Sequence, residues 1–237
     1  MVAVGSGEAI VIDTGPDPPA LDRCLNVLGI QRVPLLILTH FHADHAGGLA
    51  ALAGREVDAV LAPTGHPGAG QVAEALPRTE AIAAVPGMVL RVGGAQVTVL
   101  SARPLAGSPG ADQEESSAEN DGSVVSRIET GRTVVVATGD IELAGQAAVL
   151  RAPTPLAADV LIVPHHGSAR QTAELFAAVA APVALIGVGE NTYGHPSAIA
   201  LRELARAGST VFRTDTQGSL AVVPTDSGLE VTTERPG

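Results

Sequence analysis

Three histidines and one aspartate lie within six positions of this chain, and two glycines follow them: His40, His42, Asp44, His45, Gly47 and Gly48. The apolar segment 35–38 precedes them and is typical of a buried strand that ends at a crevice of an α/β fold. Side chains two apart on extended chain point the same way, so we expect His40 and His42 to face one cation. The turn that follows directs Asp44 and His45 toward a second position. Imidazole and carboxylate ligands suit zinc and also accept manganese or iron.

Asp140 follows the apolar run 134–136 and a glycine. The same position suits the N-cap of a helix, so a purely structural role stays open. Beside a histidine-rich site, we expect this carboxylate to bridge two cations. Together with Asp44 it is also a candidate catalytic residue that orients a nucleophile.

A second pair of histidines, His165 and His166, follows the apolar run 160–162. Neighbouring side chains on a strand point to opposite faces, so we expect one of the pair to bind metal. The other would contact substrate or orient a ligand. His195 follows the run 184–188 and either caps the next helix or joins His166 in protonating a leaving oxygen or holding a phosphate oxygen.

Two polar residues close to these histidines, Ser168 and Asn191, are expected substrate contacts. His66, by contrast, lies in a Gly- and Pro-rich turn and is expected to be a surface residue. Between His66 and His165 the sequence has no histidine, so any ligand from that region must be of another type.

The composition favours one domain and excludes a broad basic surface. The chain has 237 residues, 46% of them hydrophobic but only 2% aromatic, so the core must be aliphatic. All 14 basic residues are arginine, and the net charge of −11 argues against nucleic-acid binding through an extended basic face. Neither a signal peptide nor an apolar run of about 18–20 residues is visible, so we expect a water-soluble chain.

Short apolar runs alternate with Ala-rich helical stretches along the chain, and Gly or Pro separates them. Hairpins mixed with alternating strands and helices predict two packed sheets with helices outside. We predict strands over 9–13, 35–39, 57–62, 81–85, 88–92, 96–101, 124–129, 133–137, 159–163, 183–188, 210–213, 220–223 and 229–232. Helices are predicted over 18–28, 46–52, 141–150, 169–179 and 197–207. The segment 102–122 is predicted to be a flexible acidic loop within a single domain, 1–237.

These motifs resemble the metallo-β-lactamase superfamily and, more narrowly, the C-terminal domain of ComEC/Rec2-type DNA-uptake (competence) proteins. The resemblance spans almost the whole chain. It is carried by Ile12-Asp13-Thr14-Gly15, by residues 38–45, 138–140, 163–168 and 194–196, and by Arg213-Thr214-Asp215 with Gly218. It implies an α/β fold, a metallo-β-lactamase-like αββα sandwich of two mixed sheets with flanking helices, without the first N-terminal strand usual in such domains.

The resemblance also implies two divalent metal ions, zinc or manganese. His40 and His42 would hold one ion, Asp44 and His45 the other, Asp140 would bridge them, and His165 (or His166) would complete the set. Many members carry a further histidine where this chain has Asn120-Asp121-Gly122-Ser123. We therefore expect the first ion to have fewer ligands and to be held weakly.

The activity implied is that of a metal-dependent phosphodiester hydrolase, a nuclease acting transiently on DNA in competence-type uptake. The family context implies a domain attached to a cell-membrane protein whose channel portion is its partner. Two alternatives stay open: hydrolysis of another phosphoester, such as a phosphocholine ester, or a non-catalytic metal-binding module of an uptake complex.

Overall fold

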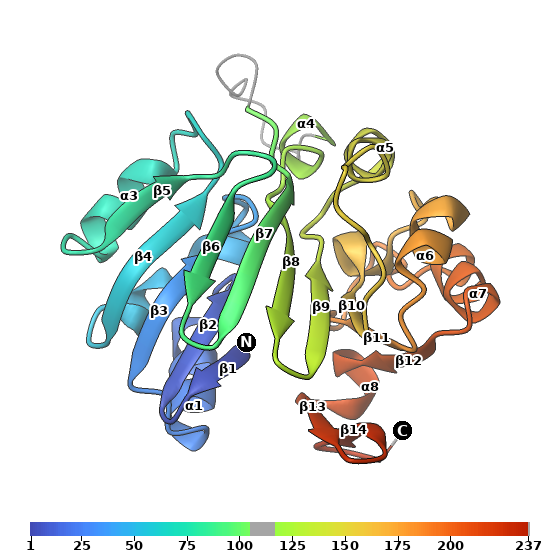
Figure 1. The fold of residues 1–237 in the computed structure, drawn as a ribbon. Coiled ribbons are helices and arrows are strands. Elements are labelled where there is room, and N and C mark those ends of the chain that lie inside the picture. Colours follow the sequence, from blue (N-terminus) through green and yellow to red (C-terminus); the bar gives the residue numbers. More distant parts are fainter. Residues whose placement is uncertain (105–116, 237) are drawn as a thin grey trace.

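A computed structural model describes residues 1–104 and 117–236, and in it two sheets pack face to face between outer layers of helices (Figure 1). The first sheet has five strands in the order β1 (Val2–Gly5), β2 (Glu8–Ile12), β3 (Arg32–Ile37), β4 (Glu56–Ala62) and β5 (Glu80–Ala83). The second has seven, in the order β12 (Thr210–Arg213), β11 (Val183–Ile186), β10 (Val160–Ile162), β9 (Thr133–Ala137), β8 (Val125–Thr130), β7 (Ala95–Ser101) and β6 (Val89–Val92). A separate hairpin pairs β13 (Leu220–Thr225) with β14 (Gly228–Thr233). This is the αββα sandwich that the sequence predicted.

Helices and short helical turns connect the strands. Those that follow strands of the first sheet are α1 (Pro18–Val27), α2 (Ala43–Ala46), the 3-10 turn η1 (Gly47–Leu52) and α3 (Ala69–Ala75). The others are α4 (Ser117–Asn120), α5 (Leu143–Val149), the 3-10 turn η2 (Pro164–Gly167), α6 (Ala173–Val179), α7 (Ala198–Arg206) and α8 (Thr214–Gln217). Among the described residues, no helix has both the length and the apolar character needed to cross a membrane.

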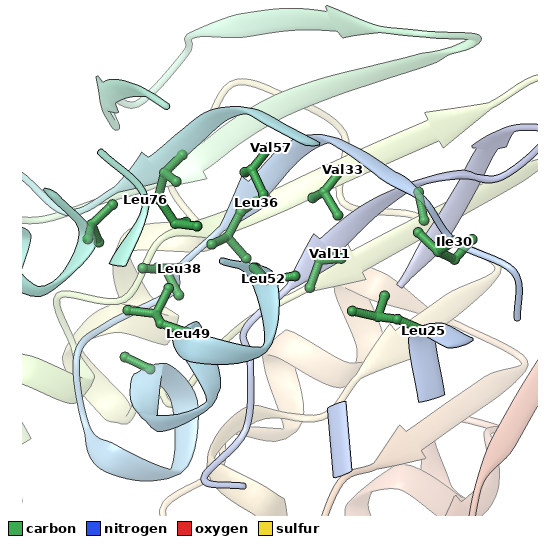
Figure 2. Close-up of a cluster of buried hydrophobic side chains, with 14 of the residues drawn as sticks. Val11, Leu25, Ile30, Val33, Leu36, Leu38, Leu49, Leu52, Val57 and Leu76 are labelled. Atoms are coloured by element: carbon green, nitrogen blue, oxygen red, sulfur yellow. The ribbon is translucent and has the colours of Figure 1, made fainter. Parts of the chain in front are cut away.

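The alternation of side chains along β3 divides the core into layers. Leu36 packs in a cluster with helical residues such as Leu25 and Leu52, which cover the outer face of the first sheet (Figure 2). Leu35 and Ile37 point the other way and join a cluster between the two sheets. Because successive side chains of a strand point to opposite faces, one apolar run serves both layers.

The layer between the sheets is aliphatic, as the scarcity of aromatic residues requires. Its buried members from the second sheet and the segments beside it include Val97, Val99, Val124 and Ile128. A third cluster lies under α5, α6 and α7, where Phe176 is among the largest fully buried side chains. Such dry layers on both faces hold the strand ends at fixed positions.

The strand directions place the chemical motifs at one edge of the sandwich. β2 to β5 run parallel to one another, and so do β9 to β12. The pairs β1–β2, β6–β7, β7–β8 and β8–β9 are antiparallel. Asp13 follows β2, His40 follows β3, Asp140 follows β9 and His165 follows β10. Carboxyl ends of parallel strands are where open α/β sheets bind ligands.

Two local expectations differ from the structure. Residues 2–5 form the edge strand β1, antiparallel to β2, which the sequence pattern did not predict. The predicted flexible loop 102–122 is wrong at its end, because residues 117–120 form α4 and Asn120 is fully buried. The remainder of that prediction, residues 105–116, lies outside the described part of the chain.

Candidate metal centre

Asp13 ties the first two parallel strands together at the site. Its Oδ1 accepts a 2.7 Å hydrogen bond from the backbone N–H of Thr39, and its Oδ2 accepts one of 2.8 Å from the Thr39 hydroxyl. The same Oδ2 lies 2.8 Å from Nδ1 of His45, so Nδ1 donates and Nε2 faces the other way. Asp13 was not among the predicted site residues; the signal that could have found it is an aspartate directly after a buried strand.

The glycine pair behind the histidines allows a close approach of backbone. A Cβ on Gly48 would lie 2.3 Å from the carbonyl oxygen of Thr14. Thr14 in turn donates through its backbone N–H (2.7 Å) and its hydroxyl (2.9 Å) to the carbonyl oxygen of His45. The turn from α2 to η1 is therefore packed directly against the segment that carries Asp13.

Four predicted site residues converge from both sheets. Ligand atoms of Asp44, His45, Asp140 and His166 lie within 4.8 Å of one another. Nε2 of His45 is 3.3 Å from Oδ1 of Asp140 and 3.6 Å from Oδ2 of Asp44. Nε2 of His166 is 3.1 Å from Oδ2 of Asp44 and 3.5 Å from Oδ2 of Asp140. Asp140, the predicted bridging residue, thus lies between the two histidines.

His40 and His42 form an adjoining pair. Nε2 of His40 lies 3.0 Å from Nδ1 of His42, and the His40 ring centroid is 4.0 Å from that of His45. The two nitrogens face each other at this distance, and the ion that they are expected to share stays a prediction.

The second pair of histidines does not extend a strand. His165 and His166 lie in η2 with φ angles of 46° and 51°, in the left-handed region. The prediction that they point to opposite faces of a strand is therefore wrong, and both rings stand beside Asp140. His166 belongs to the four-residue group, whereas Nε2 of His165 is 3.9 Å from Oδ2 of Asp140.

The partner of Nδ1 in each of these two histidines fixes which ring nitrogen faces the carboxylates of the site. Nδ1 of His166 lies 2.7 Å from the carbonyl oxygen of Gly187, which can only accept, so Nδ1 carries a proton and Nε2 faces the carboxylates. Nδ1 of His165 lies 3.4 Å from Oε1 of Glu142, a buried carboxylate that also pairs with Arg170 at 3.0 Å. Glu142 was missed because nothing in its sequence context marks it.

Charges at the site are strongly coupled. Burial disfavours a charged His45, but the carboxylates of Asp13 and Asp140 outweigh it and raise the pKa of His45 to about 11. Burial opposes ionisation of Asp44 as well, yet the hydrogen bond from His166 and the charge of His45 lower its pKa to about 2. For Asp140, His45 and His166 likewise overcome burial and lower the pKa. His40 has a pKa lowered to about 4, chiefly by burial and then by the neighbouring His45.

The donor set fits a divalent cation. Nε2 of His45 is buried and makes no in-line hydrogen bond, although the two carboxylates lie 3.3 and 3.6 Å away. A buried ring nitrogen flanked by carboxylate oxygens at these distances suits an ion beside it, and mixed imidazole and carboxylate donors suit zinc, manganese or iron. In the protein without metal, protons on the histidines offset the carboxylate charge.

Three more predicted residues lie on the loops around the group. The ring of His195 is 5.3 Å from that of His165, and burial followed by the charges of His165 and His166 lowers the pKa of His195. The Asn191 amide bonds the backbone of His195 through both ends, at 3.1 and 2.8 Å. Ser168 is buried, and its hydroxyl accepts from Arg170 N–H at 3.3 Å. Asn191 and Ser168 thus hold loops that surround the site.

The expectation that His66 is a surface residue is wrong. Its side chain is only 9% exposed, stacks on Phe41 at a centroid distance of 4.5 Å, and approaches Oε1 of Glu119 at 3.1 Å. Glu119 was missed because the acidic, Ser-rich composition around it predicted a loop. It lies on α4, beside the Asn120 segment that stands where a further histidine was sought.

Comparisons with known proteins show the family and the fold of the chain. The family model described as the metallo-beta-lactamase superfamily matches residues 1–189. The chain is 35% identical over 205 residues to ComE operon protein 3 of Bacillus subtilis, covering 83% of this chain and 25% of that protein. It is 26% identical over 220 residues to competence protein ComA of Neisseria gonorrhoeae, covering 89% and 28%. The chain thus spans about a quarter of the length of these relatives.

Solved structures of the same fold align over most of the chain. Zn(2+)-bound PqqB from Methylobacterium extorquens matches with a TM-score of 0.58 at 15% identity, covering 90% of this chain and 83% of that one. The metallo-beta-lactamase fold protein YhfI from Bacillus subtilis matches with a TM-score of 0.55 at 17% identity, covering 86% and 83%. At these identities the likeness concerns the fold alone.

Proposed function

The chain belongs to the metallo-β-lactamase superfamily, and from that premise we propose that it is a metal-dependent phosphodiester hydrolase, a nuclease that cleaves DNA during competence-type uptake. One observation carries the proposal: Asp44, His45, Asp140 and His166 bring ligand atoms within 4.8 Å of one another from both sheets. The similarity to competence proteins supports DNA as the proposed substrate class. In this proposal the domain works attached to a cell-membrane protein, beside its channel portion.

We assign two divalent ions, zinc or manganese, to the centre. His40 and His42 would hold one, Asp44, His45 and His166 would hold the other, and Asp140 would contribute to both. His165 was the first choice from the sequence, and His166 takes its place because its Nε2 is nearer the carboxylates, 3.5 Å rather than 3.9 Å from Asp140. Divalent cations supply Lewis acidity toward a phosphoryl oxygen and lower the pKa of water.

The protein's own groups then position the reactants. Asp44 and Asp140 have lowered pKa values and are ionised at neutral pH, so their oxygens accept hydrogen bonds from an attacking water and orient it. His195 has a lowered pKa and is a neutral imidazole, so its N–H donates to a phosphate oxygen or to the leaving oxygen. Asn191 fixes the His195 loop, and Ser168 fixes the turn after His166.

The acidic character of the chain sets how DNA is held. The net charge of −11 argues against binding of DNA phosphates through a broad basic surface. Two cations at the carboxyl ends of the strands provide the local positive charge instead. We therefore propose that cleavage depends on metal for substrate binding as well as for chemistry.

The direct test is cleavage of labelled single- and double-stranded DNA by the purified, metal-loaded protein with manganese or zinc. Cleavage by the unaltered protein, abolished by chelation and by Asp140→Ala, is the expected result. No cleavage by a protein that holds two ions, or equal cleavage by Asp140→Ala, would contradict it.

A panel of chromogenic phosphodiesters and phosphocholine esters belongs in the same experiment. Hydrolysis of these small esters without DNA cleavage would assign a different substrate to the same centre. Bound metal without turnover of any ester would assign a metal-binding module. Exposed Glu174 on α6 offers a matched control, since Glu174→Gln changes one carboxylate that is not among the residues assigned to the centre.

A further inference from the structure

Glu119 lies between two histidines on the side of the site that lacks the expected third histidine. Its Oε2 is 3.4 Å from Nε2 of His42, and its Oε1 is 3.1 Å from Nε2 of His66. The three side chains are 12%, 15% and 9% exposed respectively, so all three are largely removed from water. A carboxylate in such surroundings needs hydrogen-bond donors on both oxygens.

His66 is held so that it can serve as one of these donors. The backbone N–H of Gly68 donates to Nδ1 of His66 at 2.9 Å, so the ring proton must be on Nε2. That Nε2 is buried and has no hydrogen bond of good geometry among the described residues. Oε1 of Glu119 lies 3.1 Å from it, close enough to accept its proton in a hydrogen bond after a small rotation. The ring stacks on Phe41 with an interplanar angle of 9°, which fixes its plane.

His42 offers its two ring nitrogens to opposite neighbours. Nε2 faces Glu119, whereas Nδ1 lies 3.0 Å from Nε2 of His40. A carboxylate at Nε2 favours a proton there and leaves the lone pair of Nδ1 for a cation. The hydrogen bond from His42 lowers the pKa of Glu119 to about 2, so the carboxylate is ionised at neutral pH.

We propose that Glu119 and His66 are positioning residues that hold His42 in the tautomer with the proton on Nε2, so that Nδ1 is presented to the ion shared with His40. The inference rests on the proposed function, since it concerns the first ion of the same centre. Glu119 is not itself a ligand, because its oxygens face the Nε2 side of the ring, away from Nδ1. It raises the basicity of His42 and so offsets the missing histidine.

The test measures zinc retention by competition with a chelator in four variants: Glu119→Ala, Glu119→Gln, His66→Ala and the double variant Glu119→Ala/His66→Ala. Loss of an outer carboxylate costs metal sites about 10–100-fold in affinity. We expect that loss for one of the two ions in Glu119→Ala, with two ions still bound at saturating zinc. His66→Ala should weaken the same ion less, and the double variant should equal Glu119→Ala, because His66 acts through Glu119.

Histidine ¹⁵N spectra give a readout that does not depend on turnover. In the metal-free unaltered protein we expect His42 with its proton on Nε2, and in the metal-free Glu119→Ala variant a mixture of tautomers. Glu174→Gln is the control and should leave both affinity and spectrum unchanged. Should Glu119→Ala fail to fold by circular dichroism, the near-isosteric Glu119→Gln and His66→Ala carry the same measurement.

Three outcomes of the variant measurements contradict the inference in whole or in part. Zinc affinity within twofold of the control in Glu119→Ala would remove the role of Glu119, and loss of one ion even at saturating zinc would make it a ligand. If the losses of zinc affinity in the two single variants add up in the double variant, His66 does not act through Glu119. Unaltered protein that binds no zinc defeats the metal centre itself, whereas zinc binding without DNA cleavage defeats only the nuclease assignment.

Discussion

At the scale of single residues, the candidate site is built by the groups behind each histidine. Asp13 accepts a hydrogen bond from Nδ1 of His45, and the Gly187 carbonyl accepts one from Nδ1 of His166. Both rings therefore present Nε2 to Asp140. The sequence could predict the ring types, because three histidines and an aspartate in six positions are unusual. It could not predict these partners, because they come from other strands and are set by packing.

Metal binding should release protons from the site. The pKa of His45 is raised to about 11 and that of His166 is also raised, so His45 is protonated at pH 7 without metal and must lose that proton to bind an ion. We expect release of at least one proton per chain, and an apparent zinc affinity that falls as the pH is lowered. Calorimetric titration with zinc in buffers of different ionisation enthalpy measures the release; a binding enthalpy independent of the buffer would contradict it.

Tyr193 should contribute to single-stranded DNA binding. Its side chain is 82% exposed, and its ring centroid lies 6.2 Å from that of His195, so an aromatic surface stands open beside the site. A base stacked on an aromatic side chain contributes about 1–3 kcal/mol. Tyr193→Ala should therefore weaken the affinity for a labelled oligonucleotide by about 5–150-fold, while Tyr193→Phe should retain it. Equal binding by both variants would exclude stacking.

At the scale of elements, the loops after parallel strands carry nearly every site residue. The apolar run of β3 and the motif after it were predictable, because strand periodicity and the glycine pair are local signals. The turn at His165 and His166 was not, because two consecutive non-glycine residues with positive φ are disfavoured by local sterics. Helix α4 was not predicted either, because the acidic, Ser-rich sequence around it is typical of a loop.

Gly48→Ala should disrupt the site through the backbone. Its Cβ would lie 2.3 Å from the carbonyl oxygen of Thr14 and 3.0 Å from the carbonyl carbon, neither of which can move without the Asp13 segment. Overpacking of this kind costs about 1–3 kcal/mol. We expect a lower free energy of unfolding in urea and weaker zinc retention. Gly70→Ala in α3 is the matched control, because nothing lies within 4 Å of its Cβ, and it should be neutral or stabilising; equal behaviour of the two variants would refute the steric argument.

At the scale of the whole molecule, the centre joins the two sheets. Asp44 and His45 follow the first sheet, whereas Asp140 and His166 follow the second, and the buried hydrophobic cluster between the sheets is aliphatic. The composition predicted that layer, because a chain so poor in aromatics must pack Ala, Val, Leu and Ile. The register that brings Asp140 to His45 depends on how the sheets stack, which no local pattern encodes.

Removal of metal should therefore destabilise the two sheets together. An ion that binds only the folded state at a free concentration of 1,000 times its Kd adds about 4 kcal/mol, and about 2–4 °C of Tm accompanies each kcal/mol in a chain of this size. We expect the Tm of the zinc-loaded protein to fall by about 8–16 °C after chelation, and Asp140→Ala to show little dependence on zinc. Hydrogen exchange should accelerate on chelation after β3 and after β9 alike, because the ligands come from both sheets. Acceleration confined to one of these loops would mean that the ion is held by one sheet and does not join them.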